Sequence, residues 1–419
     1  MSTTRRDFLH HSALALAGIV LAPYATFAAS EKRMFSSQKK KVLVHIFQRG
    51  AMDGLMAVSP YADKHLQKFR PRLSMKLGSN GGLIELNERF GLHPSLGELA
   101  PLFEKKELAI VHGVGSPDKT RSHFDAQDFM ENGTPGRKGT PDGWLNRTLK
   151  SLPKSDSPFR GVSITGAMPR VFYGDSPVLA VSNLANFNVS AGGQGLMGMS
   201  SSSGFEALYE KTTAEILKGT AEEGFEAIKK LRELGVSNYK PENGAEYPVT
   251  PLGNALKQIA FLIKSNVGLE IAFAESGGWD THVQQGTERG AFARAATDLS
   301  KSIHAFWMDI ATFHDDVILL TSTEFGRTVR ENGSFGTDHG RASCFFLLGS
   351  TVMGGKVYGS VPELAQENLD EGRDLPVTVD FRSVYREVLE RHLGIRDAKS
   401  ARAIFPEWNG KALSLFKNA

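Results

Sequence analysis

The chain has 419 residues, with 49 lysine and arginine residues against 46 aspartate and glutamate residues. Scattered charges in this near balance argue against a nucleic-acid-binding protein, which would need a basic face. The single cysteine, Cys344, excludes an intramolecular disulfide, so stability must come from a packed core. The length is ample for one large domain.

Residues 1–29 are typical of an export signal. Residues 4–9 form a twin-arginine pattern that includes Arg5 and Arg6, an apolar stretch follows at 13–22, and small residues near Ala28 offer a cleavage site. The apolar stretch is too short to span a bilayer, and an ordinary amphipathic helix is the alternative interpretation. We therefore expect export by the Tat translocase to the periplasm or the cell exterior. A basic linker at residues 30–41 and a mature chain without a transmembrane helix are expected to follow.

Short apolar runs alternate with helical patterns along the rest of the chain. Strands are expected at residues 41–47, 108–112, 269–274, 317–321 and 344–348, and helices at 94–104, 253–264, 292–313 and 381–393. This alternation predicts an α/β domain over residues 42–419, built on a doubly wound, mostly parallel sheet. Ligands bind such sheets at the carboxyl ends of the strands.

Residues 153–251 have a different character. Strand-like runs are expected around 160–164 and 177–181, followed by a segment rich in Gly, Met and Ser at 191–204 and a helix at about 205–234. We interpret this stretch as an inserted cap that covers or shapes the site. Additional helices packed at the edge of the sheet are the alternative.

Polar side chains follow several predicted strands at the point where each strand ends. Asp280 and His282 lie two residues apart in a Gly-rich turn, so in an extended segment both can face one cation. Glu324 follows the strand at 317–321, and Arg327 beside it could bind a substrate oxyanion or the carboxylate itself. The alternatives are turn capping by Asp280 with a surface His282, and a Glu–Arg pair that stabilises the loop.

Two further positions carry metal-ligand side chains. Asp338 and His339 lie in a Gly-framed loop, where a neutral imidazole suits Zn²⁺ or Mn²⁺ and the neighbouring carboxylate could ligate or orient it. Asp53 follows the first strand in a Gly-rich turn and fits a metal ligand shared with the later motifs. Helix capping is the alternative role for Asp53.

Residues 121–124 read Arg-Ser-His-Phe and open a predicted helix. The Ser122 hydroxyl would gain from the positive end of the helix dipole, which favours an alkoxide nucleophile, and Arg121 could bind an anionic group of the substrate. A helix cap that involves Ser122 and Asp125 is the alternative.

Taken together, these motifs resemble a bacterial family exported by the twin-arginine route, known as domain of unknown function 1501. That family is similar to the alkaline phosphatase and sulfatase superfamily. The resemblance covers residues 42–415 and rests on ordered motifs around Asp53, His93, Ser122, Trp144, Asp280, Glu324 and Asp338.

The resemblance implies roles for individual residues. The implied counterparts are a first-strand ligand, Asp53, a nucleophile, Ser122, a middle pair, Asp280 and His282, and a last histidine, His339. Phe325 stands where a ligating histidine is expected. The resemblance therefore points away from a full two-zinc site, toward a single metal or a site that uses Asp338 or His123 instead.

We predict an exported metal-dependent hydrolase of phosphate or sulfate esters that acts on a small molecule or a polymer. One or two divalent ions (Zn, Mn, Mg or Ca) would be held by acidic and imidazole groups from the set Asp53, Asp280, His282, Glu324, Asp338 and His339. Ser122 would attack, and Arg121 or Arg327 would clamp the oxyanion. The alternative, which Phe325 favours, is a non-catalytic, metal-stabilised envelope protein for binding or for assembly and secretion.

Overall fold

The computed structural model describes residues 40–78, 81–184, 233 and 235–417, and its centre is one nine-stranded sheet. Its strands are β1 Val42–Gln48, β5 Leu108–Gly115, β6 Gly161–Ser163, β7 Leu179–Ala180, β8 Ile271–Ser276, β9 Val317–Thr323, β10 Ser343–Leu348, β11 Lys356–Tyr358 and β12 Val379–Asp380. They pair in the order β11-β5-β10-β9-β1-β8-β6-β7, and β12 also pairs with β5. Only β10 runs antiparallel to its neighbours.

The predicted α/β class with a mostly parallel sheet is confirmed. Every residue of β1, β5 and β9 is buried, as expected for strands that are covered on both faces. All five apolar runs predicted as strands form strands of this sheet. The antiparallel direction of β10 was not predicted, because an apolar run carries no information about direction.

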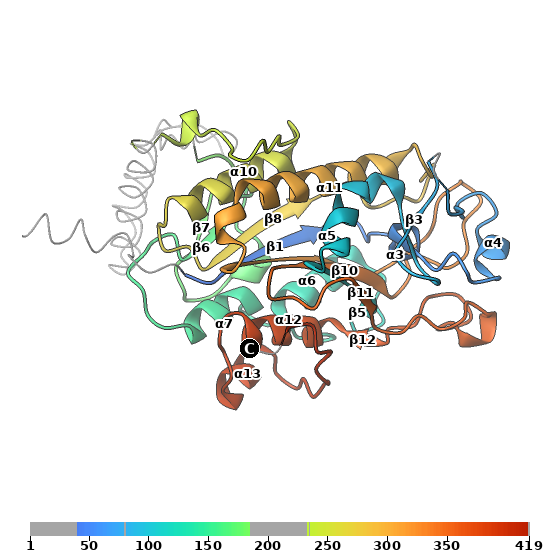
Figure 1. Cartoon of the computed structure of the whole chain (residues 1–419). Helices are drawn as coiled ribbons and strands as arrows, with labels where there is room; N and C mark the ends of the chain where they lie inside the picture. The colour runs from blue at the N-terminus through green and yellow to red at the C-terminus, as the bar shows by residue number, and fades with distance from the viewer. Residues whose placement is uncertain (1–39, 79–80, 185–232, 234, 418–419) are drawn as a thin grey trace, which may run out of the picture.

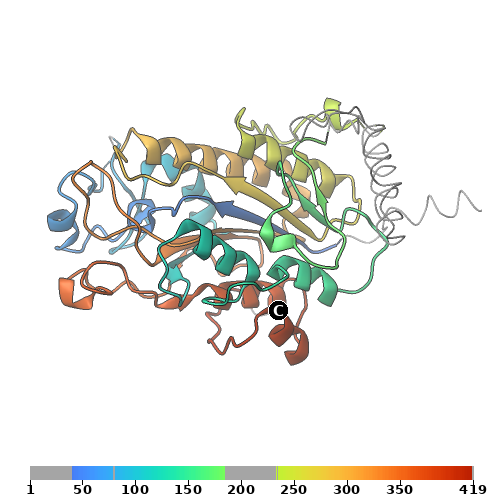
Figure 2. The ribbon, with the colours of Figure 1, turned by 180° about the vertical axis from the view of Figure 1, so that it is seen from behind.

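Helices cover both faces of the sheet (Figure 1, and from behind in Figure 2). One layer contains η1 Pro94–Leu99, α5 Ala100–Glu104, α10 Pro251–Lys264 and α11 Ala291–Asp309, and the other contains α6 His123–Asn132, α7 Trp144–Ser151, α12 Phe381–Arg391 and α13 Ala398–Ile404. Alternate side chains of β1 enter different cores: Val44 and Ile46 join the first, and Leu43 and Phe47 join the second. The sheet is therefore the middle of three layers.

Short elements complete the described chain. They are α3 Gly54–Ala57, α4 Leu66–Phe69, a small sheet of β2 Val58–Ser59, β3 Ile84–Glu85 and β4 Gly91–Leu92, and the 3-10 turns η2 Arg170–Phe172, η3 Val236–Asn238, η4 Ala311–Phe313 and η5 Gln366–Asn368. In the described ranges, no helix has the length and apolar character needed to cross a membrane.

The predicted insertion at residues 153–251 begins as part of the main sheet. Both β6 and β7 pair in parallel beyond β8, so this portion extends the edge of the sheet and does not cover it. The predicted Gly-, Met- and Ser-rich segment at 191–204 and nearly all of the predicted helix at 205–234 lie outside the described residues, as do the export signal and most of the basic linker.

Candidate metal centre

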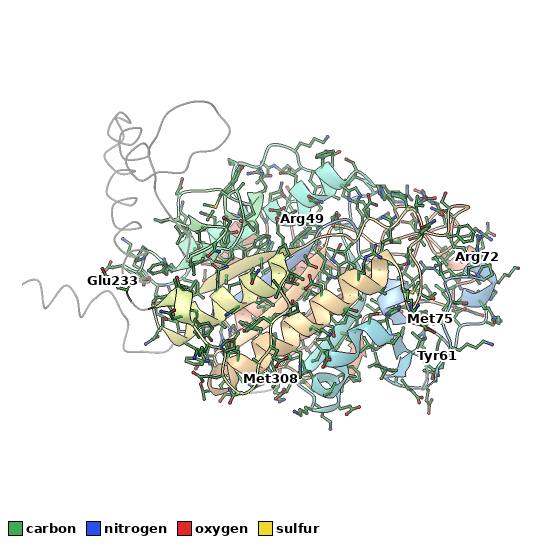
Figure 3. The ribbon with its side chains drawn as sticks, turned by 90° about the horizontal axis from the view of Figure 1, so that it is seen from above. Arg49, Tyr61, Arg72, Met75, Glu233 and Met308 are labelled. Carbon is green, nitrogen blue, oxygen red and sulfur yellow. The ribbon has the colours of Figure 1, made fainter. Side chains whose placement is uncertain are left out.

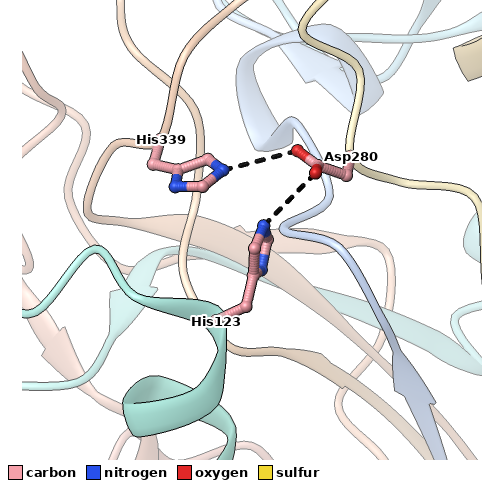
Figure 4. A group of neighbouring side chains, drawn as sticks. All are labelled: His123, Asp280 and His339. Atoms are coloured by element: carbon pink, nitrogen blue, oxygen red, sulfur yellow. Dashed lines mark ion pairs between the residues drawn. The ribbon is translucent and has the colours of Figure 1, made fainter.

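Loops at the carboxyl ends of the central strands bring a group of metal-ligand side chains together (Figure 4). His123 opens α6, Asp280 follows β8, and His339 lies between β9 and β10. One ligand atom from each lies within 4.8 Å of the others. Asp280 Oδ2 is 3.5 Å from His123 Nε2, and Asp280 Oδ1 is 3.4 Å from His339 Nε2. Ligand atoms around a tetrahedral zinc ion lie about 3.3 Å apart, so these separations fit a metal ion.

His282 brings a fourth side chain to this group. Its Nε2 lies 3.1 Å from Asp280 Oδ1 and 2.8 Å from His339 Nε2. The two loops that carry these histidines approach closely at Gly336, where a Cβ atom would lie 2.3 Å from the His282 carbonyl oxygen. A glycine is therefore needed at residue 336 to bring the two loops together.

The hydrogen bonds of the Nδ1 atoms of His282 and His339 determine whether the Nε2 atoms of these two rings carry a proton. His339 Nδ1 lies 2.8 Å from the Arg121 carbonyl oxygen, which can only accept, so this nitrogen carries the proton. His282 Nδ1 lies 3.0 Å from Asp338 Oδ1, and the same reasoning applies to a carboxylate. Two neutral rings would thus direct lone pairs at each other across 2.8 Å, which requires a proton or a metal ion between them. Metal-binding histidines are typically held in this way by a carbonyl or carboxylate.

His123 follows the same pattern. Its Nδ1 lies 2.8 Å from Glu324 Oε1, while its buried Nε2 has no hydrogen-bond partner among the described residues. Glu324 Oε1 also accepts hydrogen bonds of 2.9 Å from Gln127 Nε2 and from the Gly50 backbone N–H. Glu324 was predicted to be a metal ligand, but the structure places it behind His123 as the acceptor that orients this ring.

The environment of the centre favours the metal-binding forms of Asp280 and His339, but it favours the protonated form of His123. Burial would raise the pKa of Asp280, but hydrogen bonding and attraction to the Arg327 guanidinium lower it below its usual value. Burial lowers the pKa of His339, which favours the neutral ring. The hydrogen bond to Glu324 raises the pKa of His123, so a proton competes with a metal ion mainly at this ring.

Asp53 is engaged elsewhere. It caps α3 by accepting from Met56 N–H, and its two oxygens face the Arg70 guanidinium at 2.8 and 3.1 Å. Gln285 Nε2 donates to it at 2.6 Å, and Asp53 and Arg70 are each 1% exposed. The structure therefore shows the capping role of Asp53, with its charge balanced by a buried guanidinium.

The two arginines predicted to clamp an oxyanion also have other partners. Arg327 is buried and donates to Asp280 Oδ1 at 2.7 Å and to Thr337. Arg121 pairs with Asp374 at 2.6 Å and with Glu371 at 2.8 Å. Arg327 thus supports a candidate ligand, and the Arg121 guanidinium belongs to a separate ion-pair network.

Ser122 is exposed and forms the N-cap of α6, where its Oγ accepts from the Asp125 N–H at 3.5 Å. The helix cap, which was the alternative interpretation of Ser122, is observed, and the role as nucleophile stays a prediction. Ser122 directly precedes His123, so the candidate nucleophile adjoins a candidate ligand. The sequence analysis did not include His123 in its main set of ligands. It named His123 only as a possible replacement, because Phe325 stands where a ligating histidine is expected.

The family model described as protein of unknown function (DUF1501) matches residues 40–405. The chain belongs to this family. No curated protein matches the chain. The C-terminal periplasmic domain of EcEptC from Escherichia coli, in complex with Zn, has a TM-score of 0.36 and 9% identity, covering 75% of this chain and 74% of that one. The lipoteichoic acid synthase LtaP from Listeria monocytogenes has a TM-score of 0.35 and 12% identity, covering 75% and 67%.

Proposed function

We propose that this protein is an exported, metal-dependent hydrolase of phosphate or sulfate esters. The observation that carries the proposal is the meeting of the Nε2 atoms of three histidines with Asp280, each histidine held through its Nδ1 by a carbonyl or carboxylate. Imidazole-rich sites suit zinc. The side chains of Asp280 and His282 are 46% and 39% exposed, so a substrate can reach the centre from solvent. Export is supported by the twin-arginine pattern at the N-terminus.

The donor set fits one divalent ion. His123, His282, His339 and Asp280 would hold it, and Glu324 would keep the His123 ring in place. A bound divalent ion supplies a Lewis acid that stabilises negative charge on the reacting ester.

Ser122 is the proposed nucleophile. Its position at the N-terminus of α6 favours negative charge on its oxygen. The bond from Ser122 Oγ to phosphorus or sulfur forms as the ester bond breaks, and the serine proton passes to the leaving alcohol. Water then attacks the Ser122 ester, releases phosphate or sulfate, and returns a proton to Oγ.

The test uses the purified protein loaded with zinc or manganese and a panel of phosphate monoesters, phosphate diesters and sulfate esters. We expect turnover that Ser122→Ala abolishes while the metal content stays unchanged, since Ser122 is not a ligand. Absence of turnover on the whole panel, or full activity in Ser122→Ala, would contradict the proposal.

A non-catalytic envelope protein, stabilised by its metal and used for binding or assembly, is the second candidate. It is favoured by one observation: Arg121 and Arg327 are both committed to carboxylates of the protein. This alternative predicts that zinc binds and stabilises the fold while no ester in the panel is hydrolysed.

A further inference from the structure

Exposed apolar side chains gather on the loops that form the candidate metal centre. In the described part of the chain, the large hydrophobic residues that are exposed are Leu77, Phe124, Tyr173, Val249, Val283 and Phe335. Phe124 directly follows His123, and Val283 directly follows His282. Phe335 lies three residues before Asp338. Three of these six residues therefore lie one to three positions from His123, His282 or Asp338 in the sequence.

The loop that carries Val283 and the loop that carries Phe335 run side by side. Gln284 N–H donates to the Ser334 carbonyl at 2.9 Å, and Gln285 N–H donates to the Phe335 carbonyl at 2.9 Å. These hydrogen bonds hold the two apolar residues on neighbouring segments.

The backbone of these segments is strained. Phe335 has φ of 62° and Gln284 has φ of 46°, in the left-handed region that aromatic and long side chains rarely adopt. Residues with such backbone angles are concentrated at functional sites. The Arg72 guanidinium lies 4.2 Å from the centre of the Phe335 ring and holds one of its faces. Arg72 is labelled in Figure 3, at the end of the molecule that carries α4.

Phe124 lies in a different segment, at the start of α6. Its side chain is 90% exposed, and it follows the candidate nucleophile and the His123 ligand without a gap in sequence. Consecutive Cα atoms lie about 3.8 Å apart, so the backbone of Phe124 is adjacent to that of His123. A polar residue would serve solubility better at this position.

We propose that Phe124, Val283 and Phe335, which we call the apolar rim, bind the organic part of the ester, so that the substrate is a phosphate or sulfate ester of an apolar alcohol or phenol. The inference rests on the proposed function, which leaves the alcohol unspecified. Polar esters such as sugar phosphates would leave the rim in contact with water. An alkyl or aryl group removes this apolar surface from water and gains binding free energy in proportion to the area covered.

The test compares n-hexyl phosphate with ethyl phosphate, and the corresponding sulfates, on the zinc-loaded protein. Four added methylene groups, partly covered by the rim, should raise kcat/KM by about tenfold or more. The triple variant Phe124→Ser, Val283→Ser and Phe335→Ser should bring the hexyl-to-ethyl ratio close to one. Val249→Ser is the matched control, because Val249 is 97% exposed and lies outside the loops of the centre. The single variant Phe124→Ser covers the case in which the triple variant does not fold.

The outcomes distinguish a failure of the apolar-rim proposal from a failure of the hydrolase proposal. Equal kcat/KM values for the hexyl and ethyl esters would refute the role of the apolar rim and leave the hydrolase proposal standing. If no ester is hydrolysed, calorimetric binding of hexyl and ethyl phosphate decides: tighter binding of the hexyl compound that Phe124→Ser removes supports the rim, and equal or absent binding overturns it. A loss of preference in Val249→Ser as large as that in Phe124→Ser would also overturn it.

Discussion

Replacing Asp338 by alanine should weaken zinc binding while the protein stays folded. Asp338 Oδ1 lies 3.0 Å from His282 Nδ1, and the Asp338 side chain is 52% exposed, so little packing is lost. The substitution removes the acceptor that fixes the orientation and the tautomer of the ring. Loss of such a partner lowers metal affinity by roughly 10–100-fold, which is about 1.4–2.7 kcal/mol.

The same loss should appear in protein stability, because a zinc ion that binds the folded state would stabilise it. At free zinc 100 times the dissociation constant, the wild-type protein gains about 2.7 kcal/mol in the free energy of unfolding. At that zinc concentration, Asp338→Ala should gain only about 1.4 kcal/mol if its affinity is tenfold weaker, and about 0.4 kcal/mol if it is hundredfold weaker. Urea unfolding with and without zinc measures this difference, and chelator competition measures the affinity directly.

Asp175→Ala is the matched control, because this carboxylate is 87% exposed and pairs only with Lys150 among the described residues. We expect it to bind zinc as tightly as the wild-type protein. Equal affinity in Asp338→Ala and the wild type, within about twofold, would show that Asp338 does not hold a ligand and would refute the reasoning from ring nitrogens.

Two further predictions concern buried charge. Arg70→Met leaves Asp53 buried without its cation and should lower the free energy of unfolding by about 3–5 kcal/mol in urea titrations, whereas a change below 1 kcal/mol would show that the pair is not needed. Burial lowers the pKa of His45 to about 3 and the pKa values of His112 and His392 to about 4. The unfolded chain therefore binds protons that the folded chain does not, so stability present above pH 6.5 should be lost as the pH falls toward 4, by up to about 1.4 kcal/mol per pH unit for each ring. Urea titrations at pH 7, 6 and 5 should show this slope, and His392→Gln should reduce it; stability that is unchanged or higher at pH 5 would contradict the sign.

The sequence was sufficient to predict the central strands and to place ligand-type residues at their ends. Buried parallel strands leave a continuous apolar pattern, and such strands end at one edge of the sheet. The sequence did not show which residues are candidate ligands and which orient them, because these roles depend on which ring nitrogen faces Asp280. Glu324 and His123 are 201 residues apart in the chain, and only their contact shows that the carboxylate orients the imidazole. The pair of Asp53 and Arg70 likewise follows no periodic pattern that a reader of the sequence could use.

Phe325 illustrates how a position that cannot bind a metal can still serve the centre. From the sequence it argued against a full two-metal site and in favour of a non-catalytic protein. In the structure it is 3% exposed, and its ring centre lies 5.0 Å from the rings of both His123 and His339, nearly parallel to the first at 29°. Such packing restricts both imidazoles to the orientations in which their Nε2 atoms face Asp280. A buried guanidinium already balances Asp53, so Phe325 and Arg70 together favour the proposed site for one ion, with two of its candidate ligands packed against an aromatic ring.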